Sequence, residues 1–313
     1  MSMPELILTE FVPLAALTSW RIGGVARYLA TVRSPHGVAE AIAFADSRML
    51  PVWILGGGSN MLISDEGLPG VVIRMRDMHI DITQDFDCAA VHIGAGAPMA
   101  GTVRQLVNAG WAGMAWAEGL PGTVGGAVYG NAGCYGGAMA DTVQSVDLWR
   151  AGNIQTVPPA VLGFGYRTSA LKQHAVPHLV HGMHAGDIQP IVVGATIRLQ
   201  RADQQQLALQ LADTAVLRKS KTPQGSSCGS VFKNPPGDSA GRLIEAAGLK
   251  GYAVGTAVVA ERHANYIINR GGATSADVRA LVAHIRATVA TQSGVTLEPE
   301  VQILGEEWPF NAA

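Results

Sequence analysis

A short polar segment around an arginine is the first part of the sequence that could do chemistry. Tyr166-Arg167-Thr168-Ser169 follows Gly163-Phe164-Gly165, and Lys172 lies three residues further on. A guanidinium group can bind a carboxylate or a phosphate through two parallel hydrogen bonds, whereas most single arginines form surface ion pairs. Arg167 is therefore a candidate anion-binding residue, with a surface ion pair as the alternative.

Three other polar segments lie in unusual contexts closer to the C-terminus. The segment from Ser230 to Pro235 combines a hydroxyl, an ammonium and an amide group with one aromatic ring, a composition that also suits a solvated turn. Glu300 is flanked by proline and valine, where a carboxylate costs free energy unless it has a partner or a function. His263-Ala264-Asn265-Tyr266 precedes an apolar pair and marks either the start of a strand or the edge of a ligand site.

Two glycine-rich segments could surround an anion with backbone N–H groups. They are Gly56-Gly57-Gly58-Ser59-Asn60 and Gly119-Leu120-Pro121-Gly122-Thr123-Val124-Gly125-Gly126-Ala127. An ordinary tight turn is the commoner use of one such loop, but two long loops in one domain favour a large phosphorylated ligand. The nearest matches to the dinucleotide fingerprint, Gly56 to Met61 and Gly94 to Met99, both lack its third glycine, so a Rossmann fold is weakly supported.

Two further motif matches are weaker. Gly225-Ser226-Ser227-Cys228-Gly229 has the spacing of a serine nucleophile elbow, but the polar residues before it and the extended residues after it provide neither the strand nor the helix that this motif requires. Four nearby histidines are interrupted by proline and glycine, so a polar loop rather than a metal site is expected for His174, His178, His181 and His184. The sequence predicts no metal centre.

The elements that must position these residues are a mixture of strands and helices. Short apolar runs predict strands at 52–55, 71–74, 91–94, 145–150, 191–199, 295–297 and 301–304. Helical periodicity and capping residues predict helices at 99–108, from 204 onward, at 239–247 and at 274–294. The glycines of 119–140 predict an irregular loop system, and the change of character at 199–203 predicts a domain boundary.

Composition narrows the class of protein. The 313 residues are enough for two or three compact units, and 22 basic against 24 acidic residues leave no broad basic surface for nucleic acid. With 48% hydrophobic and 15% charged residues, intrinsic disorder is excluded. No signal peptide or membrane segment is recognisable, and Cys88, Cys134 and Cys228 match no metal or redox motif. We therefore expect a cytoplasmic protein with free thiols and no membrane insertion.

Taken in order, these segments resemble the UDP-N-acetylenolpyruvoylglucosamine reductase family over nearly the whole chain. Further similar segments are Arg21-Ile22-Gly23-Gly24-Val25-Ala26, Asn131-Ala132-Gly133-Cys134-Tyr135-Gly136 and the stretches 240–251 and 297–305. The chain is similar to the shorter members, which lack a tyrosine-bearing insertion. The resemblance implies an α+β protein with a two-lobed FAD-binding fold of the vanillyl-alcohol oxidase type over 1–200, a lobe boundary near 85–90, and a C-terminal α+β substrate domain over 201–313.

The resemblance also implies the reaction, which is NADPH-dependent reduction of UDP-N-acetylglucosamine enolpyruvate to UDP-N-acetylmuramate in peptidoglycan synthesis. Non-covalent FAD would be held by Gly56, Gly57, Gly58, Ser59, Asn60, Gly119, Pro121, Gly122, Thr123, Gly125, Gly126 and Ala127. By the same resemblance Arg167 binds the substrate carboxylate, Ser230 donates a proton, and Glu300 orients the enolate or relays a proton. The implied substrate-binding residues are Tyr166, Lys221, Asn234 and Asn265. The partner is the UDP-sugar, and no obligate protein partner is indicated.

Two alternatives remain open. The same fold hosts oxidases of alcohols and sugar acids, so fold alone does not determine the reaction. A covalent flavin would favour an oxidase, but His36, His79 and His92 in the FAD half lie in no recognisable attachment motif. A noncatalytic nucleotide-sugar or flavin-binding protein is the other alternative, and replacement of Arg167, Ser230 or Glu300 would support it, but all three are present.

Overall fold

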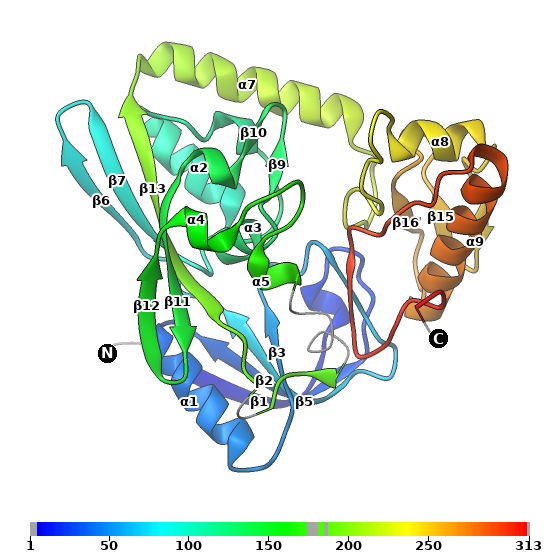
Figure 1. The fold of residues 1–313 in the computed structure, drawn as a ribbon, viewed down its shortest axis with the longest axis horizontal. Helices are drawn as coiled ribbons and strands as arrows, with labels where there is room; N and C mark the ends of the chain where they lie inside the picture. Colours follow the sequence, from blue (N-terminus) through cyan, green and yellow to red (C-terminus); the bar gives the residue numbers. More distant parts are fainter. Residues whose placement is uncertain (1–4, 174–180, 185–186, 312–313) are drawn as a thin grey trace.

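The computed structural model describes residues 5–173, 181–184 and 187–311 (Figure 1). The chain begins with a four-stranded sheet in the order β1-β2-β5-β3, in which only β1 runs antiparallel to its neighbour. Its strands are β1 (Leu6–Pro13), β2 (Val25–Val32), β3 (Val52–Leu55) and β5 (Leu68–Met75), and helix α1 (Pro35–Asp46) packs against β2 and β5. Buried valines, isoleucines and alanines of these elements form the core between the helix and the sheet.

An antiparallel sheet follows, in the order β12-β11-β13-β7-β6. Its strands are β6 (Ile80–Asp85), β7 (Cys88–Gly94), β11 (Val143–Arg150), β12 (Asn153–Val157) and β13 (Ile191–Arg201), with β8 (Trp111–Ala112) paired to β13. Helices α2 (Met99–Asn108) and α3 (Val124–Tyr129) lie on one side of it (Figure 1). Shorter elements are β9 (Gly133–Cys134), β10 (Gly137–Ala138), α4 (Pro159–Leu162), α5 (Ala170–Gln173) and the 3-10 helices Ala15–Leu17, Ala115–Ala117 and Met139–Asp141.

The long helix α7 (Gln204–Lys221) leads from this sheet to a separate C-terminal unit (Figure 1). That unit contains α8 (Ala240–Ala246), α9 (Ser275–Ser293) and an antiparallel sheet of β14 (Ala253–Val254), β15 (Ala257–Val259) and β16 (Ile267–Asn269). Helix α9 begins with a capping box between Thr274 and Asp277 and ends at Gly294, whose φ of 72° is in the left-handed region that glycine tolerates best. No helix in the described ranges is both long and apolar enough to cross a bilayer.

The N-terminal and C-terminal parts are joined by residues far apart in the sequence. The Trp20 side chain is fully buried in the C-terminal core, where its Nε1 donates to the Ile267 carbonyl at 2.7 Å. In return, the Asn269 side chain donates to the Trp20 carbonyl at 2.9 Å. The last strand, β17 (Gln302–Leu304), pairs in parallel with β4 (Met61–Ile63), directly after the first glycine loop. The C-terminal unit is therefore tied to the segments that lie between the strands of the first sheet.

Most of the predicted elements are confirmed, including β3 and α2 with the expected bounds. Two predictions are wrong. Residues 124–129 form helix α3 inside the predicted loop system, because Val124 and Val128 gain a buried face and Gly125 lets the helix approach Ala95. Residues 295–297 are not a strand, since no neighbouring strand pairs with them in the described part of the chain.

Candidate active site

The two glycine-rich loops lie against each other although 58 residues, 61–118, separate them in the sequence. A Cβ atom on Gly57 would lie 2.6 Å from the Gly122 Cα, and one on Gly122 would lie 2.7 Å from the Ser59 Oγ. A Cβ on Gly56 would similarly lie 2.7 Å from the Thr123 Oγ1. Contacts this short are possible only where the residue has no side chain, so the glycines allow the two backbones to form one surface.

This surface offers unused hydrogen-bond donors. Within the described residues, the backbone N–H groups of Gly57, Gly58 and Ser59 donate to no other protein group. The Thr123 Oγ1 is buried and also lacks a hydrogen-bond partner among these residues. Buried polar groups without partners are costly, and successive free amides form a favourable site for an anion. The loops therefore fit the diphosphate of a dinucleotide.

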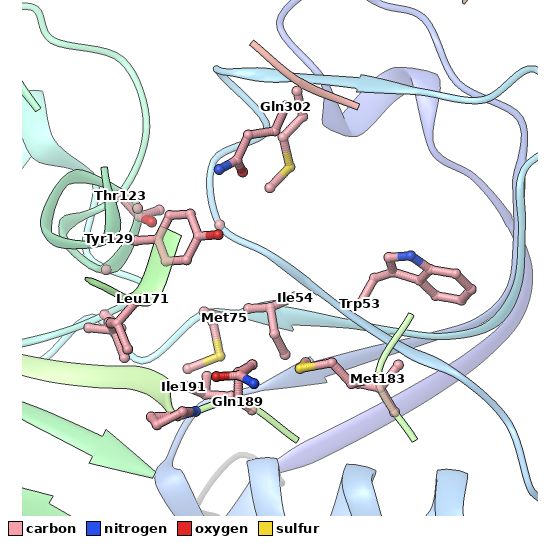
Figure 2. Close-up of a pocket in the computed structure, with 18 of the residues that line it drawn as sticks. Trp53, Ile54, Met75, Thr123, Tyr129, Leu171, Met183, Gln189, Ile191 and Gln302 are labelled. Carbon is pink, nitrogen blue, oxygen red and sulfur yellow. The ribbon is translucent and has the colours of Figure 1, made fainter. Parts of the chain in front are cut away.

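An apolar pocket begins beside these loops, at Gly56 and Thr123, and extends between the two sheets (Figure 2). Its walls are mostly hydrophobic, with contributions from Trp53, Ile54, Met75, Leu171, Met183 and Ile191, and its polar groups include Tyr129 and Gln302. Burial raises the pKa of Tyr129 to about 12, so its hydroxyl keeps its proton at neutral pH. A pocket with apolar walls and a few polar groups suits a flat heteroaromatic ring. Pocket and loops together fit FAD.

Replacing Gly57 with alanine is expected to weaken FAD binding, because the new methyl group would contact the backbone of Gly122. Overpacking of this kind costs about 1–3 kcal/mol, which corresponds to binding weaker by about 5- to 150-fold. Fluorescence titration of the apoprotein with FAD measures the change. Gly101→Ala is the matched control, since a Cβ there approaches only Pro98, at 4.0 Å. Equal FAD affinity in the two variants would contradict the role assigned to the loops.

Arg167 occupies a tight turn that is held from several sides. Its φ of 57° is unusual for a residue with a side chain, and the turn is closed by paired backbone hydrogen bonds between Gly165 and Thr168. The Asn131 side chain donates to the Gly165 carbonyl at 2.9 Å, and the Lys172 Nζ donates to the Arg167 carbonyl at 3.1 Å. The strained backbone is thereby fixed by its neighbours, as is common at functional sites.

The three segments that carry the predicted catalytic residues Arg167, Ser230 and Glu300 meet here. The Arg167 Nε lies 3.0 Å from the Glu300 Oε1. The Glu300 N–H donates to the carbonyl of Val231, the residue after Ser230, at 2.8 Å. The Glu300 carbonyl accepts from the Asn60 side chain at 3.2 Å, which joins this group to the first glycine loop. A cation, a carboxylate and the backbone that carries a hydroxyl are therefore assembled next to the loop expected to bind the cofactor.

Burial dominates the electrostatics of this group. It raises the pKa of the Glu300 carboxyl above its usual value, and the positive charges of Arg167, Lys172 and Lys233 oppose that shift without cancelling it. Burial also lowers the pKa of the Lys172 ammonium. Burial thus shifts the titration of both groups toward their neutral forms, a property typical of residues that exchange protons during a reaction.

Glu300→Gln is expected to make the folded protein more stable at neutral pH. Because the pKa of Glu300 is raised in the folded state, the folded chain holds this proton more tightly than the unfolded chain does. As the pH rises from the ordinary glutamate value of 4.5 through the raised pKa, the wild type loses stability relative to the variant. Thermal unfolding from acidic to mildly alkaline pH tests this. A difference in Tm that stays constant with pH would be the contrary result.

The predicted substrate residues have different environments. Tyr166 is 58% exposed, and its hydroxyl accepts from the Asn234 N–H at 3.4 Å. The Asn234 Oδ1 accepts from the N–H of Ala240, the first residue of α8, at 3.0 Å. Lys221 is exposed at the end of α7. The hydrogen bond between Tyr166 and Asn234 joins the Arg167 segment to the Ser230 segment.

Asn265 has a structural role that the sequence did not indicate. Its side chain is 3% exposed, and both of its polar ends bond to the Phe232 backbone, at 2.9 Å to the N–H and 2.8 Å to the carbonyl. The Asn265 carbonyl also accepts from the Val231 N–H at 2.8 Å. Asn265 thus holds the segment that carries Ser230, and its contact with the substrate stays a prediction.

Arg218 was missed among the candidate residues, although the basic end of its helix was visible in the sequence. From α7 its Nε donates to the Glu118 carbonyl at 2.7 Å, and its Nη2 lies 3.0 Å from the Cys134 Sγ. Its guanidinium group also lies 5.2 Å from the centre of the Tyr135 ring. Arg218 thus links α7 to the second glycine loop and the segment after it. Of the predicted histidine cluster, His174 and His178 lie outside the described residues.

The comparison with protein families agrees with this arrangement. Residues 26–157 match a family model described as an FAD binding domain, and residues 220–304 match the C-terminal domain of UDP-N-acetylenolpyruvoylglucosamine reductase. Together with the paired glycine loops, the first match identifies the chain as a flavin-dependent oxidoreductase with FAD as its cofactor. The predicted α+β fold class is confirmed.

Individual relatives define the family. A UDP-N-acetylenolpyruvoylglucosamine reductase of Chloroflexus aurantiacus is 49% identical and covers 93% of this chain and 96% of its own length. One from Synechococcus elongatus is 40% identical, with 96% and 95% covered. The crystal structure of a UDP-N-acetylenolpyruvylglucosamine reductase from Thermus caldophilus superposes with a TM-score of 0.76 at 32% identity, covering 96% of this chain and 99% of its own. The chain belongs to the UDP-N-acetylenolpyruvoylglucosamine reductase family.

Proposed function

We propose that this protein uses FAD and NADPH to reduce UDP-N-acetylglucosamine enolpyruvate to UDP-N-acetylmuramate, a step in peptidoglycan precursor synthesis. The observation that carries the proposal is the convergence of Arg167, Glu300 and the Ser230 segment beside the first glycine loop. FAD, when bound, accepts hydride from NADPH and supplies it to the terminal carbon of the enolpyruvyl group. The protein residues then have to stabilise the resulting enolate and protonate the adjacent carbon.

Arg167 binds the substrate carboxylate and stabilises it as negative charge spreads onto it from the enolate. Its fixed turn keeps the guanidinium group in place, so the stabilisation needs no rearrangement during the reaction. The Ser230 hydroxyl donates a proton to the adjacent carbon. Glu300, whose pKa is raised by burial, is suited to pass a proton on or to orient the reacting groups. The Lys172 Nζ supports this turn by donating a hydrogen bond to the Arg167 carbonyl.

We assign the nucleotide part of the substrate to Tyr166, Lys221 and Asn234. Lys221 provides positive charge for the diphosphate, and Tyr166 and Asn234 provide hydrogen bonds from neighbouring segments.

We propose the division into an FAD-binding domain at 1–200, with a lobe boundary near 85–90, and a substrate domain at 201–313. The separate hydrophobic core of the C-terminal part supports it. A cytoplasmic location is proposed because NADPH and nucleotide sugars are used there.

Anaerobic stopped-flow spectroscopy tests the proposed function in two half-reactions. The purified protein, mixed first with NADPH, should lose the absorbance of its oxidised flavin. It should regain that absorbance rapidly only when UDP-N-acetylglucosamine enolpyruvate is added. Loss without recovery would reject the substrate and point to a relative with another acceptor, whereas rapid recovery with oxygen alone would favour an oxidase. Absence of a flavin spectrum after reconstitution with FAD would reject the proposal as a whole.

A further inference from the structure

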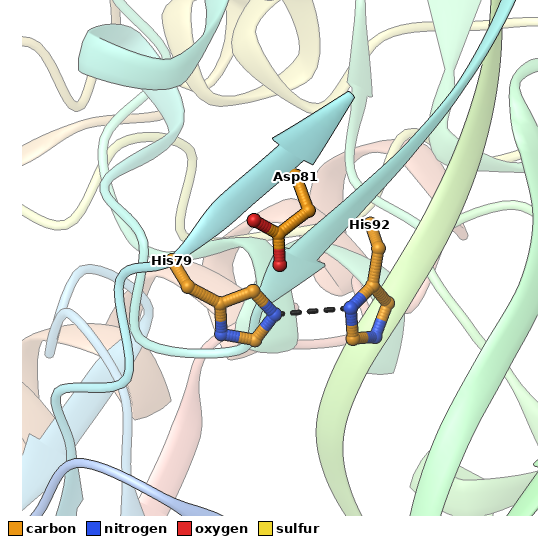
Figure 3. Close-up of side chains that lie close together, drawn as sticks. All are labelled: His79, Asp81 and His92. Atoms are coloured by element: carbon orange, nitrogen blue, oxygen red, sulfur yellow. Dashed lines mark hydrogen bonds between the residues drawn. The ribbon is translucent and has the colours of Figure 1, made fainter. Parts of the chain in front are cut away.

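Two histidines and an aspartate from the β6–β7 hairpin come together outside the pocket described above. Asp81 on β6 is the direct cross-strand partner of His92 on β7, and His79 lies two residues before Asp81, on the same side. One ligand atom from each of the three side chains lies within 4.8 Å of the others. Figure 3 shows the two imidazole rings facing each other and the Asp81 carboxylate pointing toward the space between them.

The outer nitrogen of each ring is held by a further carboxylate. The His79 Nδ1 lies 2.7 Å from the Asp77 Oδ1, and the His92 Nε2 lies 2.7 Å from the Asp147 Oδ2. Thr156 in turn donates to the Asp147 Oδ1 at 2.5 Å. A carboxylate at one ring nitrogen fixes the proton there and leaves the lone pair on the other nitrogen. Both lone pairs, on the His79 Nε2 and the His92 Nδ1, therefore face the same point.

The arrangement depends on a missing side chain in the strand between His92 and Asp147. Strand β13 separates β7 from β11, and its Gly194 is paired with Asp147. A Cβ on Gly194 would lie 3.1 Å from the His92 Nε2 and 3.2 Å from the Asp147 Oδ2. Glycine thus leaves room for the imidazole to reach across a whole strand to its carboxylate. A polar row consequently runs from β12 to the start of β6.

We propose that His79, Asp81 and His92 bind a divalent transition metal ion of the zinc type. Imidazole and carboxylate are ligands that such ions prefer, and a carboxylate on the outer nitrogen is the usual support of a metal-binding histidine. The His79 Nε2 and His92 Nδ1 are 3.0 Å apart. Two nitrogens at about 2.0–2.1 Å from a tetrahedral zinc ion are about 3.3–3.4 Å apart, so a small shift of the rings admits the ion.

The chemistry of the site favours a cation. The contact between the two ring nitrogens needs one shared proton, and a metal ion takes the place of that proton. Three carboxylates, from Asp77, Asp81 and Asp147, surround the pair and compensate the charge of a divalent ion. The rings of His79 and His92 are 34% and 40% exposed, so an ion can enter from solvent and keep water as its remaining ligand.

None of these residues lines the flavin pocket, so the proposed ion takes no part in the reduction. Its expected effect is structural. The hairpin of β6 and β7 forms one end of the second sheet (Figure 1), where β6 pairs only with β7 within the described residues. An ion bound at the start of β6 and by β7 would stabilise this end of the second sheet. Through Asp147 it would also restrain β11.

Calorimetric titration of the FAD-loaded protein with Zn²⁺, after treatment with a chelator, tests the proposal. We expect one ion per chain and a rise in Tm that depends on Zn²⁺ concentration. His92→Gln and Asp81→Asn should each weaken binding at least about tenfold. Asp147→Asn, which removes only the support of His92, should weaken it by about 10- to 100-fold. Asp81→Asn changes an exposed side chain on a hairpin strand and is chosen because it should fold even if His92→Gln does not.

Asp85→Asn on the same strand is the matched control and should bind Zn²⁺ like the wild type, because Asp85 lies outside the cluster. Binding that is unaffected by both His92→Gln and Asp81→Asn would overturn the proposal. Zn²⁺ binding that is lost in His181→Gln but retained in those two variants would also overturn the proposal, since the ion would then be bound by the other histidines. Absence of any saturable Zn²⁺ binding would overturn it directly.

Discussion

Ser230→Ala should strongly slow reduction of the enolpyruvyl substrate while leaving reduction of the flavin by NADPH intact. The substitution removes the proposed proton donor but no residue of the flavin pocket, and the segment stays anchored by Asn265. General acid catalysis contributes about 10²–10⁴ to a rate, so a loss of that size is expected in the second half-reaction alone. Stopped-flow measurement of the two half-reactions separates them.

Ser227→Ala is the matched control for this experiment. Ser227 lies in the same segment, three residues before Ser230, and has no proposed role. It should leave both half-reactions at the wild-type rate. If Ser230→Ala kept full turnover, the proton would have to come from another group, and the assignment of Ser230 would be wrong.

Arg167→Ala should impair both binding of the substrate and the chemical step. The guanidinium group is proposed to hold the carboxylate in the ground state and to stabilise it further as charge develops, so KM should rise and kcat should fall. Removing one preorganised stabilising group costs about 10²–10³ in kcat. Loss of the positive charge should also raise the pKa of Glu300 further, because Arg167 is the strongest of the charges that lower it.

Arg167→Lys provides the comparison. A lysine keeps the charge but not the planar pair of donors, so it should restore part of the binding and less of the rate. Steady-state kinetics across a pH range would show both the recovery and the shift of the Glu300 titration. A variant Arg167→Ala with unchanged kcat would exclude the stabilising role, even if its KM were raised.

Local sequence signals predicted the elements that they control. Helix α9 could be placed because its capping box, its apolar face and its terminal glycine all belong to one continuous segment. Strand β3 was visible as an apolar run before a glycine turn. Strands β1 and β2 and helix α1 were not predicted, since β1 is largely exposed and β2 alternates irregularly, so neither carries a clear apolar pattern.

Local sequence signals predicted the residue types of the site but not their contacts. The glycine loops and the three proposed catalytic residues were identified by residue type and by resemblance, and the structure adds that the segments carrying them meet. Asn265 and Arg218 could not be assigned from the sequence, because the role of each depends on a partner more than thirty residues away. The cluster of His79 and His92 depends on a strand register and on Gly194, neither of which a local pattern reveals.

The contacts between the first glycine loop and the last strand affect when the loop can fold during synthesis of the chain. Asn60 donates to the Glu300 carbonyl and accepts from the Gln302 N–H, and β4 has only β17 as its partner in the described residues. During synthesis these contacts of the first glycine loop form only after residues 300–304 have been made. The hydrogen bond of Trp20 likewise forms only after Ile267 has been made. Long loops of this kind slow folding. A chain released before residue 300 lacks both Glu300, which we propose acts in catalysis, and the contacts that hold the first glycine loop.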